Sequence, residues 1–91
     1  MPLGTAMKFF FVYLIINQNK KRTISYVGYT NDVNRRVMLH NTSKGAKFTR
    51  GRKWRLIYKK KYLSKQKAMS AEYNLKKNYY LRKQIIKKSL N

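Results

Sequence analysis

The order of apolar and polar residues predicts a β-hairpin at the start of the chain. Residues Lys8 to Ile16 are rich in aromatic and β-branched side chains and, after Lys8, apolar without a break, which is typical of a strand covered on both faces. The polar stretch Asn17 to Lys21 predicts a turn, and Arg22 to Gly28 predicts a second strand. We expect these two strands to pair in antiparallel fashion.

A helix and a basic loop are predicted after the hairpin. The helix ends near His40 and is preceded by three residues with capping oxygens, Thr30, Asn31 and Asp32. The acid Asp32 also suits the positive end of the helix dipole. The polar stretch Asn41 to Lys53 then carries two glycines and many basic residues, which favours a loop.

A third strand and two more helices complete the predicted order β-β-α-β-α-α. In Trp54 to Tyr62, apolar and basic residues alternate, so we expect a strand with Trp54, Leu56 and Tyr58 on one covered face. Ser64 can cap a helix over Lys65 to about Lys76, and a last helix is expected over Tyr79 to Leu90. The order of elements indicates an α+β domain.

The length of 91 residues allows one small domain. We expect this domain to span residues 7–91, with residues 1–6 as a flexible segment or a remnant of cloning. The sequence has no cysteine, which excludes disulfides and thiolate metal sites, and His40 is the one histidine, which excludes a zinc site made of several histidines. The apolar run Phe9 to Ile16 is too short to span a bilayer, so we expect no membrane association and a cytoplasmic monomer.

The net charge of +21, from 23 Lys and Arg against two acids, indicates an anionic partner. An A/T-rich genome can explain many lysines but not the near absence of acids, whose codons tolerate the same bias. Nucleic acid is the partner that fits best, through phosphate contact and counterion release.

Two tyrosines of the hairpin are candidates for a shared polar site. With an even number of residues in the turn, odd positions of the first strand share a face with even positions of the second, because side chains alternate along a strand. Tyr13 and Tyr26 would then point to the same side. The alternative is a pair of ordinary core tyrosines, whose hydroxyls would still need partners.

The first helix and the helix after Ser64 add charged candidates. Arg36 lies beside the apolar stripe of the first helix, His40 follows one turn later on the same side, and Arg35 is rotated away toward solvent or phosphate. Glu72 lies on or beside the apolar face of its helix. A carboxylate there needs a basic partner or a metal, and both interpretations stay open at this point.

These residues give the chain a resemblance to the GIY-YIG nuclease family, and to its small stand-alone bacterial members in particular. The motifs are "FVYLI" around Tyr13, "YVG" at Tyr26 to Gly28, "TNDVNRRVMLHN", "GAKFTRGRKWRLIY" and "AMSAEYNLKK", in order from about Met7 to Lys77. The first motif departs from the pattern, with Phe11 where the family has glycine. The resemblance implies a three-stranded antiparallel sheet flanked by helices.

The same resemblance implies metal-dependent hydrolysis of DNA phosphodiester bonds and a role in DNA repair or processing. Glu72 would hold Mg²⁺ or Mn²⁺, Arg36 would neutralise charge on the phosphoryl group, and His40 would position a tyrosine or relay a proton. Tyr13 or Tyr26 would act on the attacking water, and Gly28 would let the backbone turn or approach closely. The sequence does not decide between the tyrosines.

The basic loop is expected to bind DNA beside this site, through Lys44, Lys47, Phe48, Arg50 and Arg52, with Arg35 contributing from the helix. Phe48 could stack on an unpaired base. DNA would be read by backbone or structure, including branched or single-stranded forms, more than by sequence. The alternatives are a non-catalytic basic module associated with RNA or the ribosome, and a structural protein that coats DNA.

Overall fold

The computed structural model describes residues 8–90 and has the predicted order of elements. Three antiparallel strands form one sheet in the order β2-β1-β3, and three helices and a short 3₁₀ turn, η1, complete the fold. The strands are β1 Phe10–Gln18, β2 Thr23–Thr30 and β3 Arg55–Tyr62; the helices are α1 Val33–Asn41, η1 Lys47–Thr49, α2 Lys65–Lys77 and α3 Tyr79–Leu90. The expected segment 1–6 lies outside the described residues.

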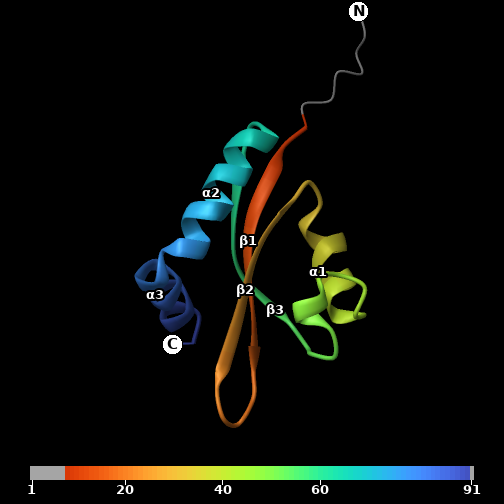
Figure 1. Cartoon of the computed structure of the whole chain (residues 1–91), viewed down its shortest axis with the longest axis vertical. Helices are drawn as coiled ribbons and strands as arrows, with labels where there is room; N and C mark the ends of the chain where they lie inside the picture. Colours follow the sequence, from red (N-terminus) through yellow and green to blue (C-terminus); the bar gives the residue numbers. More distant parts are fainter. Residues whose placement is uncertain (1–7, 91) are drawn as a thin grey trace, which may run out of the picture.

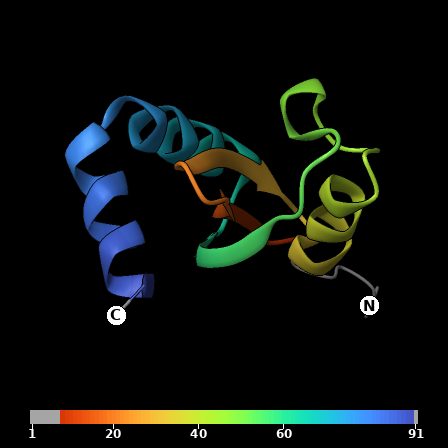
Figure 2. The same cartoon turned by 90° about the horizontal axis from the view of Figure 1, so that it is seen from below.

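The sheet is the middle of three layers, with α2 and α3 on one face and α1 with the following loop on the other (Figures 1 and 2). Alternate residues of the central strand β1 pack on opposite faces of the sheet. Val12 and Leu14 pack with Ala68 and Leu75 on the α2 side, whereas Tyr13 belongs to the other cluster. The prediction of a first strand covered on both faces is therefore confirmed.

The hairpin register places Tyr13 and Tyr26 on the same face, as the parity of their positions predicted. Tyr13 pairs with Gly28, and Ile15 pairs with Tyr26, so the two tyrosines point to the α1 side. The turn begins two residues later than expected because Asn17 and Gln18 continue the strand. Four residues, 19–22, therefore connect the strands, which is an even number.

The expectation that β3 is covered on one face only is wrong. A β-bulge shifts the pairing between Leu14, which faces Tyr58, and Ile15, which faces Leu56. The extra residue turns Leu56 toward the α1 side and Tyr58 toward the α2 side. Leu56 and Tyr58 therefore lie on opposite faces of the sheet, although they are two positions apart in the sequence.

Side-chain caps fix where α1, α2 and α3 begin. The Asp32 carboxylate accepts a hydrogen bond from the Arg35 amide at 3.1 Å, which explains why one of two acids stands here. Ser64 caps α2 as predicted, and Asn78 caps α3. None of the helices within residues 8–90 has the length and apolar character needed to cross a membrane.

Candidate active site

A cleft of about 430 Å³ opens where the hairpin, the start of α1 and the middle of α2 meet. Its lining includes four of the residues that the sequence singled out, from four elements: Tyr13, Tyr26, Arg36 and Glu72. Arg35, Asp32 and Gly28 also line it. Tyr13 and Glu72, which are 59 positions apart in the sequence, thus lie around one space.

Behind the cleft, Tyr13 begins a buried chain of hydrogen bonds. Its hydroxyl lies 2.7 Å from Nε2 of His40, and Nδ1 of His40 lies 2.8 Å from Oγ1 of Thr49. Thr49 in turn donates to the carbonyl of Ala46 at 2.9 Å. Tyr13, His40 and Thr49 are all fully buried, so each of their polar atoms depends on these contacts.

The chain of hydrogen bonds assigns the protons on the His40 ring. Thr49 has one hydroxyl proton and donates it to Ala46, so its oxygen accepts from Nδ1–H of His40. The Nε2 atom of a neutral ring is then an acceptor, and Tyr13 donates to it. Burial lowers the pKa of His40, and the nearby Arg36 charge lowers it further, which keeps the ring neutral.

The phenol of Tyr13 is held in its protonated form. Burial raises the pKa of Tyr13 to about 12, while the Arg36 guanidinium beside it acts in the opposite direction. Desolvation outweighs the positive charge because the ring is fully buried. Tyr13 is therefore a hydrogen-bond donor toward His40 at neutral pH.

Two glycines leave the room that the Tyr13–His40 pair needs. A side chain at Gly28, which pairs with Tyr13 across the hairpin, would overlap the Tyr13 hydroxyl. A side chain at Gly45 would overlap Nδ1 of His40. Close approach, and not a positive φ, is the reason for glycine at both positions.

Tyr26 lies between the buried pair and the surface. Its ring is 5.0 Å from the His40 ring and 6.2 Å from the Phe48 ring, which stacks on it at 21°. Tyr26 is half-buried, whereas Tyr13 has no exposed surface. Of the two tyrosines, Tyr26 is the one that offers part of its surface to a molecule in the cleft.

The two adjacent arginines of α1 have different surroundings. Arg36 is half-buried, and its Nε atom is buried without a hydrogen-bond partner among residues 8–90. Arg35 is exposed, although it also lines the cleft. The prediction that Arg36 lies inward and Arg35 outward on α1 is confirmed, and both remain within reach of a ligand.

Glu72 enters the cleft from α2 with a side chain that is 17% exposed. It forms an ion pair with Lys76, one helical turn away, at 3.5 Å. Lys76 is itself 50% exposed, so solvent screens the pair and leaves it weak. Of the two interpretations that the sequence left open for Glu72, the basic partner is present as Lys76, and the role as a metal ligand stays a prediction.

Comparison of the sequence with known proteins identifies the family of the chain. A family model described as the GIY-YIG catalytic domain matches residues 9–84. The chain belongs to the GIY-YIG family. This domain places the chain in a nuclease superfamily.

The GIY-YIG chain is also similar to several curated bacterial proteins. A UPF0213 protein of Oceanobacillus iheyensis is 47% identical over 52 residues, which are 56% of this chain and 60% of that protein. A UPF0213 protein of Staphylococcus epidermidis is 44% identical over 63 residues, 68% of this chain and 74% of that protein. The aligned stretch therefore covers less than two thirds of the first relative, and the names of both relatives state no activity.

A solved structure is similar to the GIY-YIG chain as well. The solution NMR structure of the UPF0213 protein from Bacillus halodurans is 38% identical and has a TM-score of 0.46. The comparison covers 86% of this chain and 81% of that protein.

The residues present in this GIY-YIG cleft fit a hard divalent cation. Such ions need one or two carboxylates, with water and phosphate oxygens as the other ligands. Glu72 meets this requirement, while Asp32, the second carboxylate of the cleft, is engaged in capping α1. Within residues 8–90 no three His, Cys, Asp or Glu side chains cluster, so the donor set suits Mg²⁺ or Mn²⁺ better than zinc.

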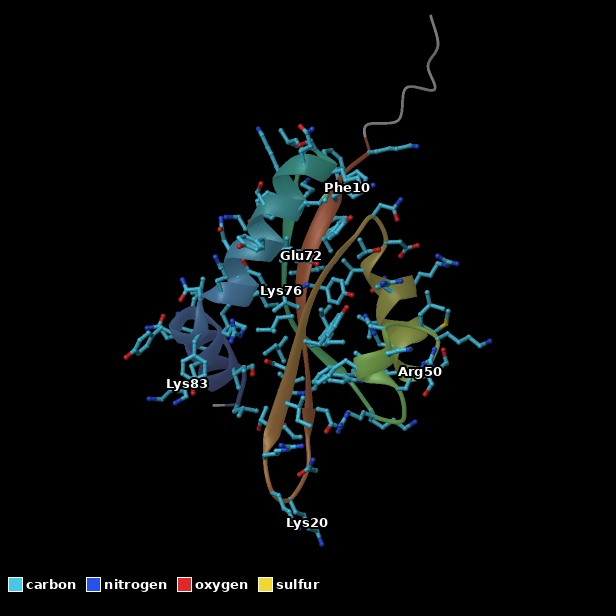
Figure 3. All side chains as sticks on the ribbon, in the orientation of Figure 1. Phe10, Lys20, Arg50, Glu72, Lys76 and Lys83 are labelled. Atoms are coloured by element: carbon cyan, nitrogen blue, oxygen red, sulfur yellow. The ribbon has the colours of Figure 1, made fainter. Side chains whose placement is uncertain are left out.

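The expected DNA-binding residues of the loop do not line this GIY-YIG cleft. Lys44, Lys47 and Arg50 are exposed on the α1 side of the sheet, where Arg50 projects from the molecule (Figure 3). Phe48 is half-exposed, and the Arg52 guanidinium lies 5.9 Å over its ring. Their role in DNA binding stays a prediction.

Sequence reasoning did not single out Thr49 and Gly45, which complete the surroundings of His40. It also left out Lys65 and Phe10, which line the cleft. The one sign of Thr49 in the sequence was its position, as a polar uncharged residue between Phe48 and Arg50 in the basic loop. The expected core residue Trp54 is buried, and its indole donates to the Thr49 carbonyl at 2.9 Å.

Proposed function

We propose that this GIY-YIG chain is a metal-dependent DNA endonuclease that hydrolyses phosphodiester bonds in the cleft described above. The observation that carries the proposal is the convergence of Tyr26, Arg36 and Glu72 on one space, backed by the buried Tyr13–His40 pair. A phenol, a cation and a carboxylate are the groups needed to orient water, neutralise phosphoryl charge and hold a divalent ion.

Tyr26 orients the attacking water through its hydroxyl group. Partial exposure in the cleft supports this choice, because the reacting water must reach the phenol. The hydroxyl of Tyr13 is buried and already donates to His40, so Tyr13 supports the site from behind. The His40 ring packs against both tyrosines and fixes their relative positions.

Arg36 contacts the phosphate during the reaction. Its guanidinium lies at the cleft wall, where a phosphate in the cleft can accept charge-assisted hydrogen bonds from it. Charge that develops on the phosphoryl oxygens is stabilised by a cation that is already in place. Arg35, exposed at the same rim, contributes to binding of the backbone.

Glu72 would hold the divalent cation, with Mg²⁺ or Mn²⁺ as the expected ion. Such an ion, when bound, would supply positive charge for the scissile phosphate and the departing 3′ oxygen. The Lys76 ammonium occupies one Glu72 oxygen through a screened contact, which a cation and a phosphate can displace.

The charge of +21 supports a nucleic-acid substrate whose backbone or structure is read more than its sequence. A role in DNA repair or processing fits such a substrate. The proposed location is the cytoplasm.

Incubation of the full chain with plasmid, branched DNA and single-stranded DNA tests the proposal. Each substrate is combined with Mg²⁺, Mn²⁺ or EDTA, and products are resolved by electrophoresis. We expect cleavage with the metals and none with EDTA, and we expect Tyr26→Phe to abolish it. Tight binding without cleavage under every condition would support the non-catalytic module instead.

A further inference from the structure

Next to the cleft, two smaller depressions of about 240 Å³ each are lined by residues of β2. The first shares Tyr26 with the cleft and is bounded on the α2–α3 side by Lys76 and Arg82. The second shares Ser25 and Arg82 with the first. Because each depression shares lining residues with the next, the two depressions are neighbours along β2, and together we name them the β2–α3 groove.

The far half of the β2–α3 groove lies between β2 and one face of α3. That face carries Tyr79, Arg82, Lys83 and Ile86, at the spacing of successive helical turns. Polar Thr23 and Ser25 line the opposite wall. The groove thus has a cationic and aromatic wall and a neutral polar wall.

The charges of the groove continue those of the cleft. Figure 3 shows Glu72, Lys76 and Lys83 following one another along α2 and α3, on the side of the sheet away from Arg50. The two acids of the chain are Asp32 and Glu72, and both belong to the cleft. Beyond Glu72 the groove is therefore lined by positive and neutral side chains, which suits a chain of phosphates.

Tyr79 adds an exposed ring to the far half of the groove. Its side chain is 58% exposed, and the Lys83 ammonium lies 5.3 Å from the ring centroid. Arg82 lies 5.8 Å from the same ring, but this guanidinium also donates to the Leu75 carbonyl at the end of α2. Tyr79 and Lys83 are thus free for a ligand in a way that Arg82 is not.

We infer that the β2–α3 groove binds an unpaired nucleic-acid strand that leaves the cleft, with Tyr79 stacking on a base and Lys83 contacting phosphate. The inference rests on the proposed function for its direction, because the strand is taken to start at the cleaved phosphate. Stacking on an exposed tyrosine requires a free base face, which a duplex does not offer. Cations beside aromatic rings are the usual composition of surfaces that bind single strands.

Binding measured in EDTA tests the inference without any cleavage. Fluorescein-labelled oligothymidylate is titrated with wild type and with Tyr79→Ala/Lys83→Gln, and anisotropy is recorded over a salt series. We expect the double variant to lose about tenfold or more in affinity for oligothymidylate. The slope of log affinity against log salt should fall in magnitude by about 0.7, the value for one phosphate contact on a single strand.

A matched control exists on α2. Tyr73 and Lys77 form the same i,i+4 pair, with the ammonium 4.6 Å from the ring and Tyr73 56% exposed, but neither lines the groove. Tyr73→Ala/Lys77→Gln should bind oligothymidylate as wild type does. Tyr79→Phe should also keep most of the affinity, because it retains the ring.

Two results would overturn the inference. Equal losses of oligothymidylate affinity in the two double variants would show that the effect comes from lowering the net positive charge and not from a site in the groove. An equal loss for a blunt duplex of the same length would show that the groove holds paired DNA. Neither result depends on cleavage, so a chain without nuclease activity can still confirm the groove, and an active nuclease can still refute it.

Discussion

The Tyr13 hydroxyl donates a hydrogen bond of 2.7 Å to Nε2 of His40, and both side chains are fully buried. The contact joins the middle of β1 to the end of α1 across the α1 side of the sheet. It fixes the angle at which α1 presents Arg36, which lies one turn before His40. The geometry of the cleft therefore depends on a buried polar pair as well as on apolar packing.

The raised pKa of Tyr13 should make the stability that its hydroxyl contributes depend on pH, which a comparison of wild type with Tyr13→Phe can measure. Burial raises the pKa of Tyr13 from 10.0 to about 12. Above pH 10 the unfolded chain therefore loses this proton first, and the contribution of Tyr13 to stability declines until about pH 12. Tyr13→Phe should be less stable than wild type by about 1–3 kcal/mol at pH 9, since Nε2 of His40 loses its donor.

Wild type and Tyr13→Phe should differ less in their free energy of unfolding at pH 11 than at pH 9, as measured by urea unfolding. Comparison with Tyr13→Phe removes the effects of all other titrating groups. Tyr80→Phe is the control, because Tyr80 is 79% exposed, and it should match wild type at both pH values. A difference that stays constant from pH 9 to pH 11 would contradict the buried, protonated phenol.

Thr49 should control the tautomer of His40. In wild type, Nδ1 carries the proton because Thr49 accepts from it. Thr49→Val removes this acceptor, while Thr49→Ser keeps it. We expect nitrogen NMR of the ring to report the Nδ1–H tautomer in wild type and Thr49→Ser, and a mixed or inverted population in Thr49→Val. The same dominant tautomer in all three proteins would remove Thr49 from the account.

Arg36 and Arg35 should differ in what their loss affects. Arg36→Ala should lower the cleavage rate at saturating DNA by about 100–1000-fold, the range for loss of one donor that stabilises a transition state. Arg35→Ala should weaken binding and leave the saturated rate close to wild type, because its side chain is exposed at the rim. Single-turnover kinetics separate the two effects, and equal rate losses would argue against the assignment.

The loop after α1 should bind the phosphate backbone of DNA. Lys47 and Arg50 are exposed there, whereas Arg52 lies over the Phe48 ring, so the first two are the cleaner pair to replace. Lys47→Ala/Arg50→Ala should reduce the salt slope of duplex binding by about 1.8 if each residue contacts one phosphate. Anisotropy titrations over a salt series measure this slope, and an unchanged slope would place the duplex elsewhere.

Much of the fold could be predicted because its signals are local. Asp32 and Ser64 mark the starts of α1 and α2 through their own side chains, and the even turn sets the faces of Tyr13 and Tyr26. The faces of β3 could not be predicted in the same way. The bulge opposite Leu14 and Ile15 arises from the pairing of β1 with β3, which are distant in the sequence. The alternation of apolar and polar residues in β3 does not indicate it.

The candidate site shows the same division. Arg36 and His40 could be placed on one side of α1 from helical spacing alone, and the family resemblance pointed to Glu72. Thr49 and Gly45 could not be found, because the path of the loop around His40 depends on tertiary contacts. Asn41, for example, donates to the Trp54 carbonyl at 3.1 Å and so ties the end of the loop to the end of α1.

Replacement of Glu72 tests the central claim, which is that the carboxylate in this cleft supports metal-dependent cleavage. Glu72→Gln keeps the shape of the side chain and removes its charge. Lys76→Gln is the matched control, because it breaks the same 3.5 Å ion pair and leaves the carboxylate in place. If Glu72 served only as the partner of Lys76, the two variants would behave alike.

The decisive measurement is the single-turnover cleavage rate of both variants and wild type over a Mg²⁺ titration, with DNA affinity measured in parallel. We expect Glu72→Gln to lose cleavage at every Mg²⁺ concentration while it binds DNA about as tightly as wild type. Lys76→Gln should cleave at a rate close to wild type, with somewhat weaker binding. Wild-type cleavage by Glu72→Gln would contradict the account.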